Sequence, residues 1–407
     1  MDAGGRCDKR RAESARASLI FLAKSRGGAR FVGLAEGHDL HCDSPKRPKK
    51  DRLTVPSSTP RPFAFTRGRA FAAVLLALVP VLPPGAAEAQ NPRFFRIAAG
   101  STSGSNFTIG GAIASAISNP PGSRPCDKGG SCGVPGLVAV AQSTQGSVEN
   151  VALIARGAVD SALVQADVAY WAYHGTGPYA GKGATRNLRA VATLYPELVH
   201  VVTSARGDIA GIAELRLRRV SLGEQGSGTL VNARAILKAF GMGELDVVPF
   251  YLQPGTAADL LAKEGLDAFF VNAGPPVPAV AELARSMPIR LLPIGGDARE
   301  ALRREFPFFS ARSVPAGAYA GVGKVDTLAV ATQFLVGAEL DEKLVYGVAA
   351  ALWHPNTQKM LESAGRLAAG IAREGALEGL AVPLHPGAAL WYFERGMIQG
   401  DPARHRP

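Results

Sequence analysis

The chain has 407 residues and a formal net charge of +11 at pH 7. Residues 1–90 hold 16 Lys or Arg and 8 Asp or Glu, so the remainder carries a net charge of only +3. A surface built to bind nucleic acid is therefore not expected in the main part of the chain. The roughly 318 residues that follow position 89 exceed what one hydrophobic core usually serves, which favours two lobes.

An export signal is predicted over residues 61–89. Three arginines between Arg61 and Arg69 precede an apolar run at 70–82, and a small-x-small cleavage signal follows. The apolar run is shorter than the about 20 residues that span a bilayer, although an uncleaved anchor is the alternative. We therefore expect a periplasmic protein whose mature chain starts near Gln90. Residues 1–60 are interpreted as a mis-called start or a disordered leader.

Two cysteines, Cys126 and Cys132, remain in the predicted mature chain and lie on a Gly-rich stretch. In an exported protein, this close spacing favours a local disulfide. A metal site is not expected, because no histidine lies near them in the sequence to complete a ligand set.

Strand and helix patterns alternate along the chain, which predicts an α/β fold. The first unit has the order strand, helix, strand, helix, strand at 95–98, 106–117, 137–141, 147–156 and 160–165. The second unit repeats this order at 220–222, 230–240, 247–252, 255–263 and 267–272. The first unit is longer by about 15 residues, which is the size of the cysteine loop. A repeated βαβαβ unit explains this agreement; chance similarity of two α/β halves is the alternative.

Two β-rich segments, 188–193 and 198–203, are expected to cross between the lobes, and the chain is expected to return near 306–315. The predicted boundaries are 90–203 plus 311–407 for lobe 1 and 204–310 for lobe 2. Two similar α/β lobes joined by two strands are typical of a hinged solute receptor. Its ligand would bind beyond the carboxyl ends of the strands.

A Gly/Ser loop follows the first strand of each unit, at Ser101–Asn106 and at Glu224–Thr229. Backbone N–H groups and hydroxyls in such a loop, together with the dipole of the next helix, favour an anion. Thr229 is expected to cap its helix, as Ser147 is for the helix that it opens. A helix cap without a ligand is the alternative for each loop. The second loop lacks the Gly-Lys-Ser/Thr ending of a nucleotide-binding loop.

Polar residues stand at corresponding strand ends, Gln165 in the first unit and Asn272 in the second. Asp167 then opens an aromatic helix, where it either caps the helix or meets an amino or hydroxyl group of a ligand. Tyr195 and Glu197 lie at the presumed crossing between the lobes. Tyr195 is expected to form the floor of the cleft, and Glu197 to pair with a positive group of the ligand. An ordinary turn is the alternative for both.

The sequence does not contain a recognisable catalytic constellation. Neither a Gly-x-Ser-x-Gly elbow nor a His-Glu-x-x-His motif is present, and the histidines are scattered. His200 lies in a β run and is expected to be a buried structural residue. We therefore predict no catalytic residue, no metal and no cofactor. A two-lobe transferase on the same fold is the rival from the enzyme class.

Several ordered motifs resemble the TAXI family, the substrate-binding receptors of TRAP (tripartite ATP-independent periplasmic) transporters. They are Gln142–Asn150, Asp160–Asp167, Ala192–Glu197, Gly226–Thr229 with Asn232–Ala235, and Leu384–Ala388. The resemblance covers about residues 93–395. Ser103–Thr108 departs from the family's usual Gly-Gly-Thr-Tyr-Tyr-Pro loop, and the cysteine insertion departs from its commonest pattern.

The resemblance implies a two-lobe type II periplasmic binding protein fold with hinge strands and a ligand cleft. Such a receptor captures a small carboxylate, either an amino acid such as glutamate or another organic acid, and delivers it to a fused integral-membrane TRAP permease. A monomer is expected. A sensor receptor and an envelope protein without a ligand are the alternatives. The expected ligand contacts are Ser103, Ser105, Asn106, Gln165, Asp167, Tyr195, Gly226, Ser227, Gly228, Thr229, Asn272 and Gly274.

Overall fold

The computed structural model describes residues 91–400, all of which belong to one unit of the chain. The predicted leader (1–60) and signal peptide (61–89) lie outside the described residues. Within residues 91–400, no helix has the length and apolar character needed to cross a membrane.

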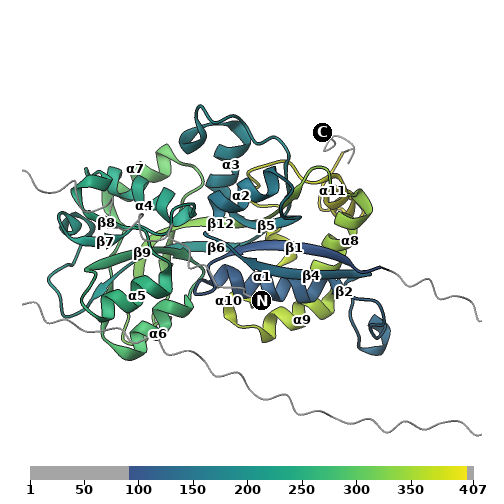
Figure 1. The fold of residues 1–407 in the computed structure, drawn as a ribbon, viewed down its shortest axis with the longest axis horizontal. Helices are drawn as coiled ribbons and strands as arrows, with labels where there is room; N and C mark the ends of the chain where they lie inside the picture. Colours follow the sequence, from purple (N-terminus) through teal and green to yellow (C-terminus); the bar gives the residue numbers. More distant parts are fainter. Residues whose placement is uncertain (1–90, 401–407) are drawn as a thin grey trace, which may run out of the picture. The chain divides into compact units, whose positions relative to one another are not determined.

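A ten-stranded mixed sheet organises the fold, with helices on both of its faces (Figure 1). The strand order is β4-β1-β5-β12-β6-β9-β7-β8, with β10 paired to β6 and β11 paired to β12. The strands are β1 (Arg93–Gly100), β4 (Leu137–Ser143), β5 (Ser161–Gln165), β6 (Leu188–Ser204), β7 (Arg219–Ser221), β8 (Val248–Phe250), β9 (Ala268–Ala273), β10 (Ile289–Leu291), β11 (Ser310–Val314) and β12 (Val325–Gly337). This arrangement confirms the predicted α/β class.

The helices connect and cover these strands. They are α1 (Ser105–Ile117), α2 (Ser147–Ala155), α3 (Ala166–His174), α4 (Gly228–Ala239), α5 (Pro254–Ala262), α6 (Pro278–Ser286), α7 (Gly296–Glu305), α8 (Glu342–Leu352), α9 (Pro355–Ser363), α10 (Arg366–Ala369) and α11 (Pro386–Phe393). A separate parallel pair, β2 (Ser118–Asn119) and β3 (Val134–Pro135), brackets the cysteine loop.

The repeat predicted from the sequence is visible in the sheet. β1 lies between β4 and β5 and is parallel to both, and β7 lies in the same way between β8 and β9. We call β1, β4 and β5 with α1–α3 the first half, and β7–β9 with α4–α7 the second half. The carboxyl ends of corresponding strands therefore carry the two Gly/Ser loops.

Two long antiparallel strands, β6 and β12, run through both halves. The start of β6 pairs with the end of β12, and the end of β6 pairs with β9. The two segments that were predicted to cross between the lobes, 188–193 and 198–203, thus belong to one strand. The alternative that Tyr195–Glu197 forms an ordinary turn is wrong. The ladder shifts register between Thr332 and Gln333, opposite Leu194, and Pro196 pairs with β12 alone because β9 pairs with β6 only from Leu198 onward.

Three clusters of buried side chains form the core. One covers the first half and the C-terminal helices α8 and α11. The other two lie on opposite faces of the second half, under α4 and α7 on one side and under α5 and α6 on the other (Figure 1). Val314 and Leu328 belong to these second-half clusters, so β12 rather than 306–315 returns to the first half. The division into two lobes remains a prediction.

The cysteine loop lies between α1 and β4, where Cys126 and Cys132 form the predicted disulfide. His354, which begins α9, is close by, with its Nε2 3.8 Å from the Cys126 sulfur. The expectation that no histidine lies near the cysteines is therefore wrong in space, although it holds in sequence.

The disulfide predicts a measurable contribution to stability. Closing a loop of this length restricts the unfolded chain, so the Cys126→Ser/Cys132→Ser double variant should unfold with about 2 kcal/mol less free energy in urea. Alkylation of the unreduced, unfolded protein should leave both sulfurs unmodified by intact-mass analysis. Two adducts before reduction would show that the bond is not formed.

Candidate functional site

A small polar pocket lies where the two halves meet. Its cavity volume is about 50 Å³, and the Gly/Ser loops and strand ends of both halves line it. Seven residues of the predicted set take part: Ser105, Asn106, Gln165, Ser227, Gly228, Thr229 and Asn272. The pocket also contains Glu197 and Glu224, which were not in that set.

Direct hydrogen bonds join the halves across the pocket. The Ser103 hydroxyl accepts from the Gly255 N–H at 3.1 Å, and the Ser105 hydroxyl accepts from the Gly274 N–H at 3.0 Å. The Gly226 carbonyl accepts from the first turn of α2, at 3.0 Å from the nitrogens of both Val148 and Glu149. Ser103, Gly226 and Gly274 do not line the cavity; here they hold one half against the other.

Glu197 is a fully buried carboxylate on β6 at the centre of the site. Its oxygens accept from Asn106 Nδ2 at 2.8 Å, Gln165 Nε2 at 2.6 Å and Thr332 Oγ1 at 2.6 Å. Burial raises the pKa of Glu197, while these three hydrogen bonds oppose the rise. The first loop, the end of β5 and strand β12 are thereby tied to one carboxylate.

Asp167 forms a second buried anchor and is not part of the cavity lining. It accepts from Asn232 Nδ2 at 2.6 Å, and Asn232 Oδ1 in turn accepts from Asn272 Nδ2 at 2.9 Å. Burial raises the pKa of Asp167 to about 6. Asp167 therefore acts through Asn232 on Asn272, which does line the cavity, and a direct contact of Asp167 with a ligand stays a prediction.

Three buried oxygens that belong to lining residues have no hydrogen-bond partner within residues 91–400. They are Gln165 Oε1, Glu224 Oε1 and Asn272 Oδ1. Each side chain is more than nine-tenths buried. Buried polar atoms are nearly always paired in folded proteins, so these three acceptors make the pocket the candidate ligand site.

Glu224 is the residue that sequence reasoning missed. It lies in the second Gly/Ser loop, and burial raises the pKa of its carboxyl to about 7. The signal was present in the sequence, because an acidic residue opens a loop that contains neither Lys nor Arg.

The two Gly/Ser loops contribute hydrogen-bond donors at the starts of α1 and α4. The N-cap of α1 is Gly104, which offers no side-chain hydrogen bond to the first turn. In α4 the N-cap is Ser227, whose hydroxyl accepts from the Leu230 N–H at 3.1 Å, so the predicted cap at Thr229 is wrong. Thr229 Oγ1 instead accepts from the Asn272 N–H at 3.1 Å, which leaves its hydroxyl proton available.

The predicted cap at Ser147 is also wrong, because Gly146 is the N-cap of α2. The Ser147 hydroxyl accepts from the Gln165 N–H at 3.1 Å. It therefore connects the start of α2 to the end of β5, beside the pocket.

Comparison with known proteins assigns the family. Residues 97–396 match the model of the NMT1-like family, about three quarters of the chain. This protein belongs to the NMT1-like family.

Solved structures of similar fold include the periplasmic aliphatic sulphonate binding protein SsuA from Escherichia coli (14% identity, 78% of this chain and 84% of that chain, TM-score 0.38). A second is a putative L-cystine ABC transporter from Listeria monocytogenes (13% identity, 70% of this chain and 99% of that chain, TM-score 0.41). A third is PhnD1 from Prochlorococcus marinus (MIT 9301) in complex with methylphosphonate (10% identity, 76% of this chain and 100% of that chain, TM-score 0.44). At these identities and TM-scores, the likenesses add no argument about the ligand.

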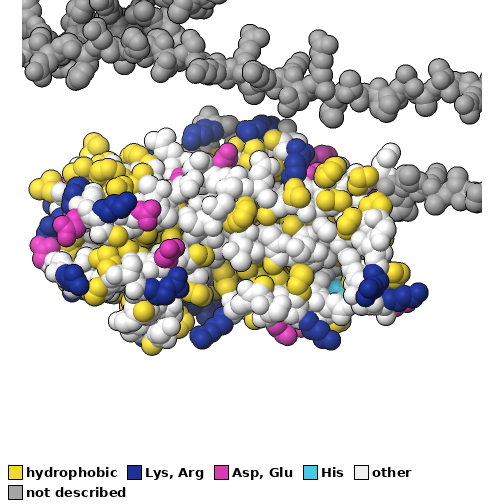
Figure 2. Space-filling model, turned by 60° about the horizontal axis from the view of Figure 1, so that its bottom comes forward, with side chains coloured by type: hydrophobic (Ala, Val, Ile, Leu, Met, Phe, Trp, Pro, Cys, Tyr) yellow, Lys and Arg dark blue, Asp and Glu magenta, His cyan; other side chains and the backbone are white. Residues whose placement is uncertain are grey.

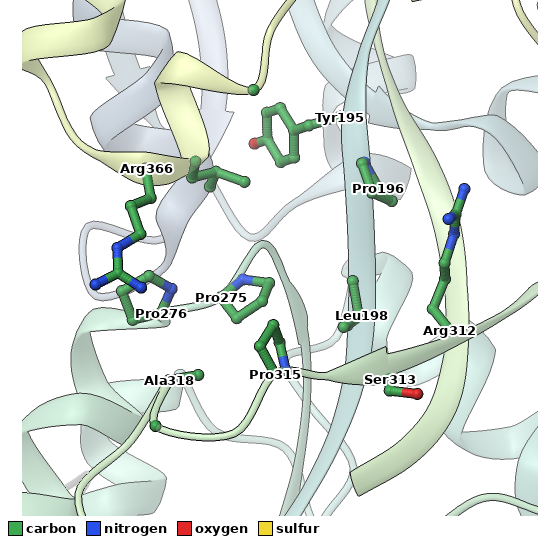
Figure 3. A pocket seen from close by; sticks show the side chains of 13 residues that line it. Tyr195, Pro196, Leu198, Pro275, Pro276, Arg312, Ser313, Pro315, Ala318 and Arg366 are labelled. Carbon is green, nitrogen blue, oxygen red and sulfur yellow. The ribbon is translucent and has the colours of Figure 1, made fainter. Parts of the chain in front are cut away.

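A larger cavity of about 580 Å³ adjoins the polar pocket of the NMT1-like chain. Figure 3 shows its lining of Tyr195, Pro196 and Leu198 from β6, prolines from neighbouring loops, and Arg312 and Arg366 on opposite sides. The Tyr195 hydroxyl donates to Asn106 Oδ1, so the tyrosine stands between the two cavities. Tyr195 lines the larger cavity and does not line the polar pocket, so its place at the floor of a ligand cleft stays a prediction.

Gly274 lies beside this larger cavity rather than in the polar pocket. A Cβ added at Gly274 would come 2.3 Å from Leu367 Cδ1, so the backbone here packs against α10 without room for a side chain. A side chain at this position would require Leu367 to move.

The face seen in Figure 2 has hydrophobic and uncharged side chains over much of its centre, with Lys and Arg mostly toward its edges. A single basic patch of the kind that binds nucleic acid is not visible on this face.

Cys126, Cys132 and His354 bring three candidate ligand atoms within 4.8 Å of one another. The two sulfurs are bonded to each other, and His354 Nδ1 accepts from the Asn356 N–H at 3.1 Å. A neutral imidazole with Nδ1 as acceptor carries its proton on Nε2, the nitrogen that faces the sulfurs. The cluster therefore does not suit a metal ion in this form.

His200 is buried as expected, between the Leu198 carbonyl at 2.9 Å and the Tyr319 hydroxyl at 2.9 Å. Burial lowers its pKa to about 4, so the ring is neutral at physiological pH. The expectation of a buried structural histidine is confirmed.

Glu224→Gln tests the buried charge. Above pH 4.5 the unfolded chain ionises at Glu224, whereas the folded protein keeps the proton until about pH 7. Wild type should therefore lose stability from this group as the pH rises through this window, and the glutamine variant should not. The stability of Glu224→Gln relative to wild type should increase by up to about 3 kcal/mol between pH 4.5 and pH 8.

Urea unfolding at several pH values provides the measurement, with Glu282→Gln on an exposed face of α6 as the matched control. A difference between Glu224→Gln and wild type that is constant with pH would show that Glu224 is not buried in a charge-excluding site.

Proposed function

We propose that this protein is an exported receptor that captures a small carboxylate, an amino acid or another organic acid, for a TRAP-type secondary transporter. The observation that supports it best is the pocket itself. Corresponding loops and strand ends from two copies of one βαβαβ unit converge there on a single set of buried polar atoms.

The chemistry of the lining favours capture. Of the residues that line the polar pocket, none is His, Cys, Lys or Arg, and its side chains offer hydrogen bonds rather than a nucleophile paired with a base. Charge-assisted hydrogen bonds from such groups contribute roughly 1.5–3 kcal/mol each in an enclosed site. Several together suffice for micromolar affinity after the cost of ordering the ligand.

The size of the cavity implies that the halves move. About 50 Å³ is smaller than the roughly 300–1,000 Å³ of typical small-molecule pockets. Direct hydrogen bonds from Ser103, Ser105 and Gly226 close the site in the present arrangement. A solute enters when these bonds open, and β6 and β12 are the strands about which the halves would turn, because only they extend through both.

The carboxylate end of the solute would lie against the first turns of α1 and α4. The uncapped start of α1 and the hydroxyl of Thr229 supply donors there, and the helix dipoles favour a negative charge. Periplasmic location, a monomeric state and delivery to a fused membrane permease are parts of the same proposal.

Gly228→Ala tests whether the polar pocket is the binding site. A Cβ at Gly228 would lie 2.0 Å from Gln165 Oε1, so the methyl group would displace the amide and fill the cavity. Alanine suits the first turn of α4, and folding should persist. We expect binding of the preferred solute to weaken at least tenfold in calorimetry, from a panel of 2-amino, 2-hydroxy and 2-oxo acids.

Gly111→Ala is the matched control, because a Cβ at this helical glycine of α1 meets nothing within 4 Å. Its affinity should equal that of wild type. A folded Gly228→Ala variant that binds as tightly as wild type would exclude this pocket as the site.

A further inference from the structure

The orientation of the Gln165 amide is fixed from behind. Its Nε2 donates to Glu197 at 2.6 Å, and Glu197 also takes donors from Asn106 and Thr332. A carboxylate that receives three donors would repel an amide oxygen, so Gln165 cannot rotate its Oε1 towards Glu197 without losing this bond. The oxygen is therefore held away from Glu197 and beside Gly228, which lines the pocket, and it lacks a hydrogen-bond partner among the described residues.

A second series of amides fixes Asn272 in the same way from the other half. Asp167 accepts from Asn232 Nδ2 at 2.6 Å, which turns Asn232 Oδ1 outward to accept from Asn272 Nδ2 at 2.9 Å. Asn272 Oδ1 is then the atom left for the pocket, and it also lacks a partner in residues 91–400. Two independent carboxylates thus hold two amides so that each presents an acceptor.

Glu224 adds a third acceptor and a charge. Its Oε1 is buried without a partner in the described part of the chain, and no Lys or Arg belongs to the pocket lining. Burying carboxylates without a cation is unfavourable, which is why burial raises the pKa values of Glu224, Asp167 and Glu197. A positive group in the pocket would compensate the charge and supply donors to acceptors that lack one.

We propose that the solute presents an amino group, as an ammonium, to Gln165 Oε1, Asn272 Oδ1 and Glu224, so that the site selects amino acids over the corresponding hydroxy and keto acids. An ammonium has three N–H donors, which matches three acceptors. This inference rests on the proposed receptor function. It assigns Glu224 as the residue that sets the charge of the ligand.

Matched sets of solutes test the selection. The purified protein, freed of bound solute by dialysis in denaturant and refolded, is titrated at pH 7.5 with L-glutamate, 2-oxoglutarate and L-2-hydroxyglutarate. The alanine, pyruvate and lactate set and the serine, hydroxypyruvate and glycerate set follow. In the set that binds tightest, the amino acid should bind at least tenfold more tightly than either partner, which equals about 1.4 kcal/mol.

The outcomes separate this inference from the proposed function. A keto or hydroxy acid that binds as tightly as its amino counterpart would overturn the amino-group proposal while a carboxylate receptor stands. Binding of putrescine but of no acid would support the amino group and overturn the carboxylate. No binding by any of these solutes, by calorimetry or native mass spectrometry, would overturn both.

Glu224→Gln gives a second readout, the number of protons released on binding. This number would not change if Glu224 had only a structural role. An ammonium beside Glu224 favours its ionised form, so wild type should release protons on binding near pH 7. Calorimetry in phosphate and in Tris measures that release. The variant should bind at least tenfold more weakly with less proton release, whereas Glu282→Gln should match wild type. Unchanged affinity and proton release in Glu224→Gln would remove Glu224 from the site.

Discussion

The buried carboxylate of Glu197 is the interaction on which the site depends. It lies on a strand that runs through both halves, and it accepts hydrogen bonds from α1, β5 and β12. Within residues 91–400 no Lys or Arg forms an ion pair with it, so its burial is tolerable only while these donors are in place. The geometry of the first loop and of Gln165 follows from that requirement.

The same arrangement recurs in both halves of the repeat. Each half ends a central strand with an amide, Gln165 or Asn272, and each amide is backed by a carboxylate, directly in the first half and through Asn232 in the second. The repeat places the two amides at corresponding positions. The carboxylates, in the second half through Asn232, take up an N–H of each amide, and both amide oxygens lack a partner among the described residues. Hydrogen-bond donors for a ligand are then left to the loops and helix starts.

Much of this could be predicted because local sequence determines it. Alternating strand and helix patterns gave the α/β class, and the two Gly/Ser loops located the pocket at corresponding strand ends. Other features arise only when distant segments meet. Glu197 was assigned either to a positive group of a ligand or to an ordinary turn, because the sequence did not show that residues 188–204 form one strand. At Pro196 this strand pairs with β12 alone, since its pairing with β9 begins at Leu198. The contact between His354 and the cysteine loop joins residues 228 positions apart.

Residues in the predicted set fell into two groups. Gln165 and Asn272 at the strand ends line the cavity, as do loop residues next to the helix starts such as Thr229. Ser103 and Gly226, which precede the helices in the same loops, instead form hydrogen bonds between the halves. The most direct test of the account is to denature the purified protein and identify the released solute by mass spectrometry. The account predicts one stoichiometric solute with an amino nitrogen and an acid group; a stoichiometric solute without any N–H group would contradict it.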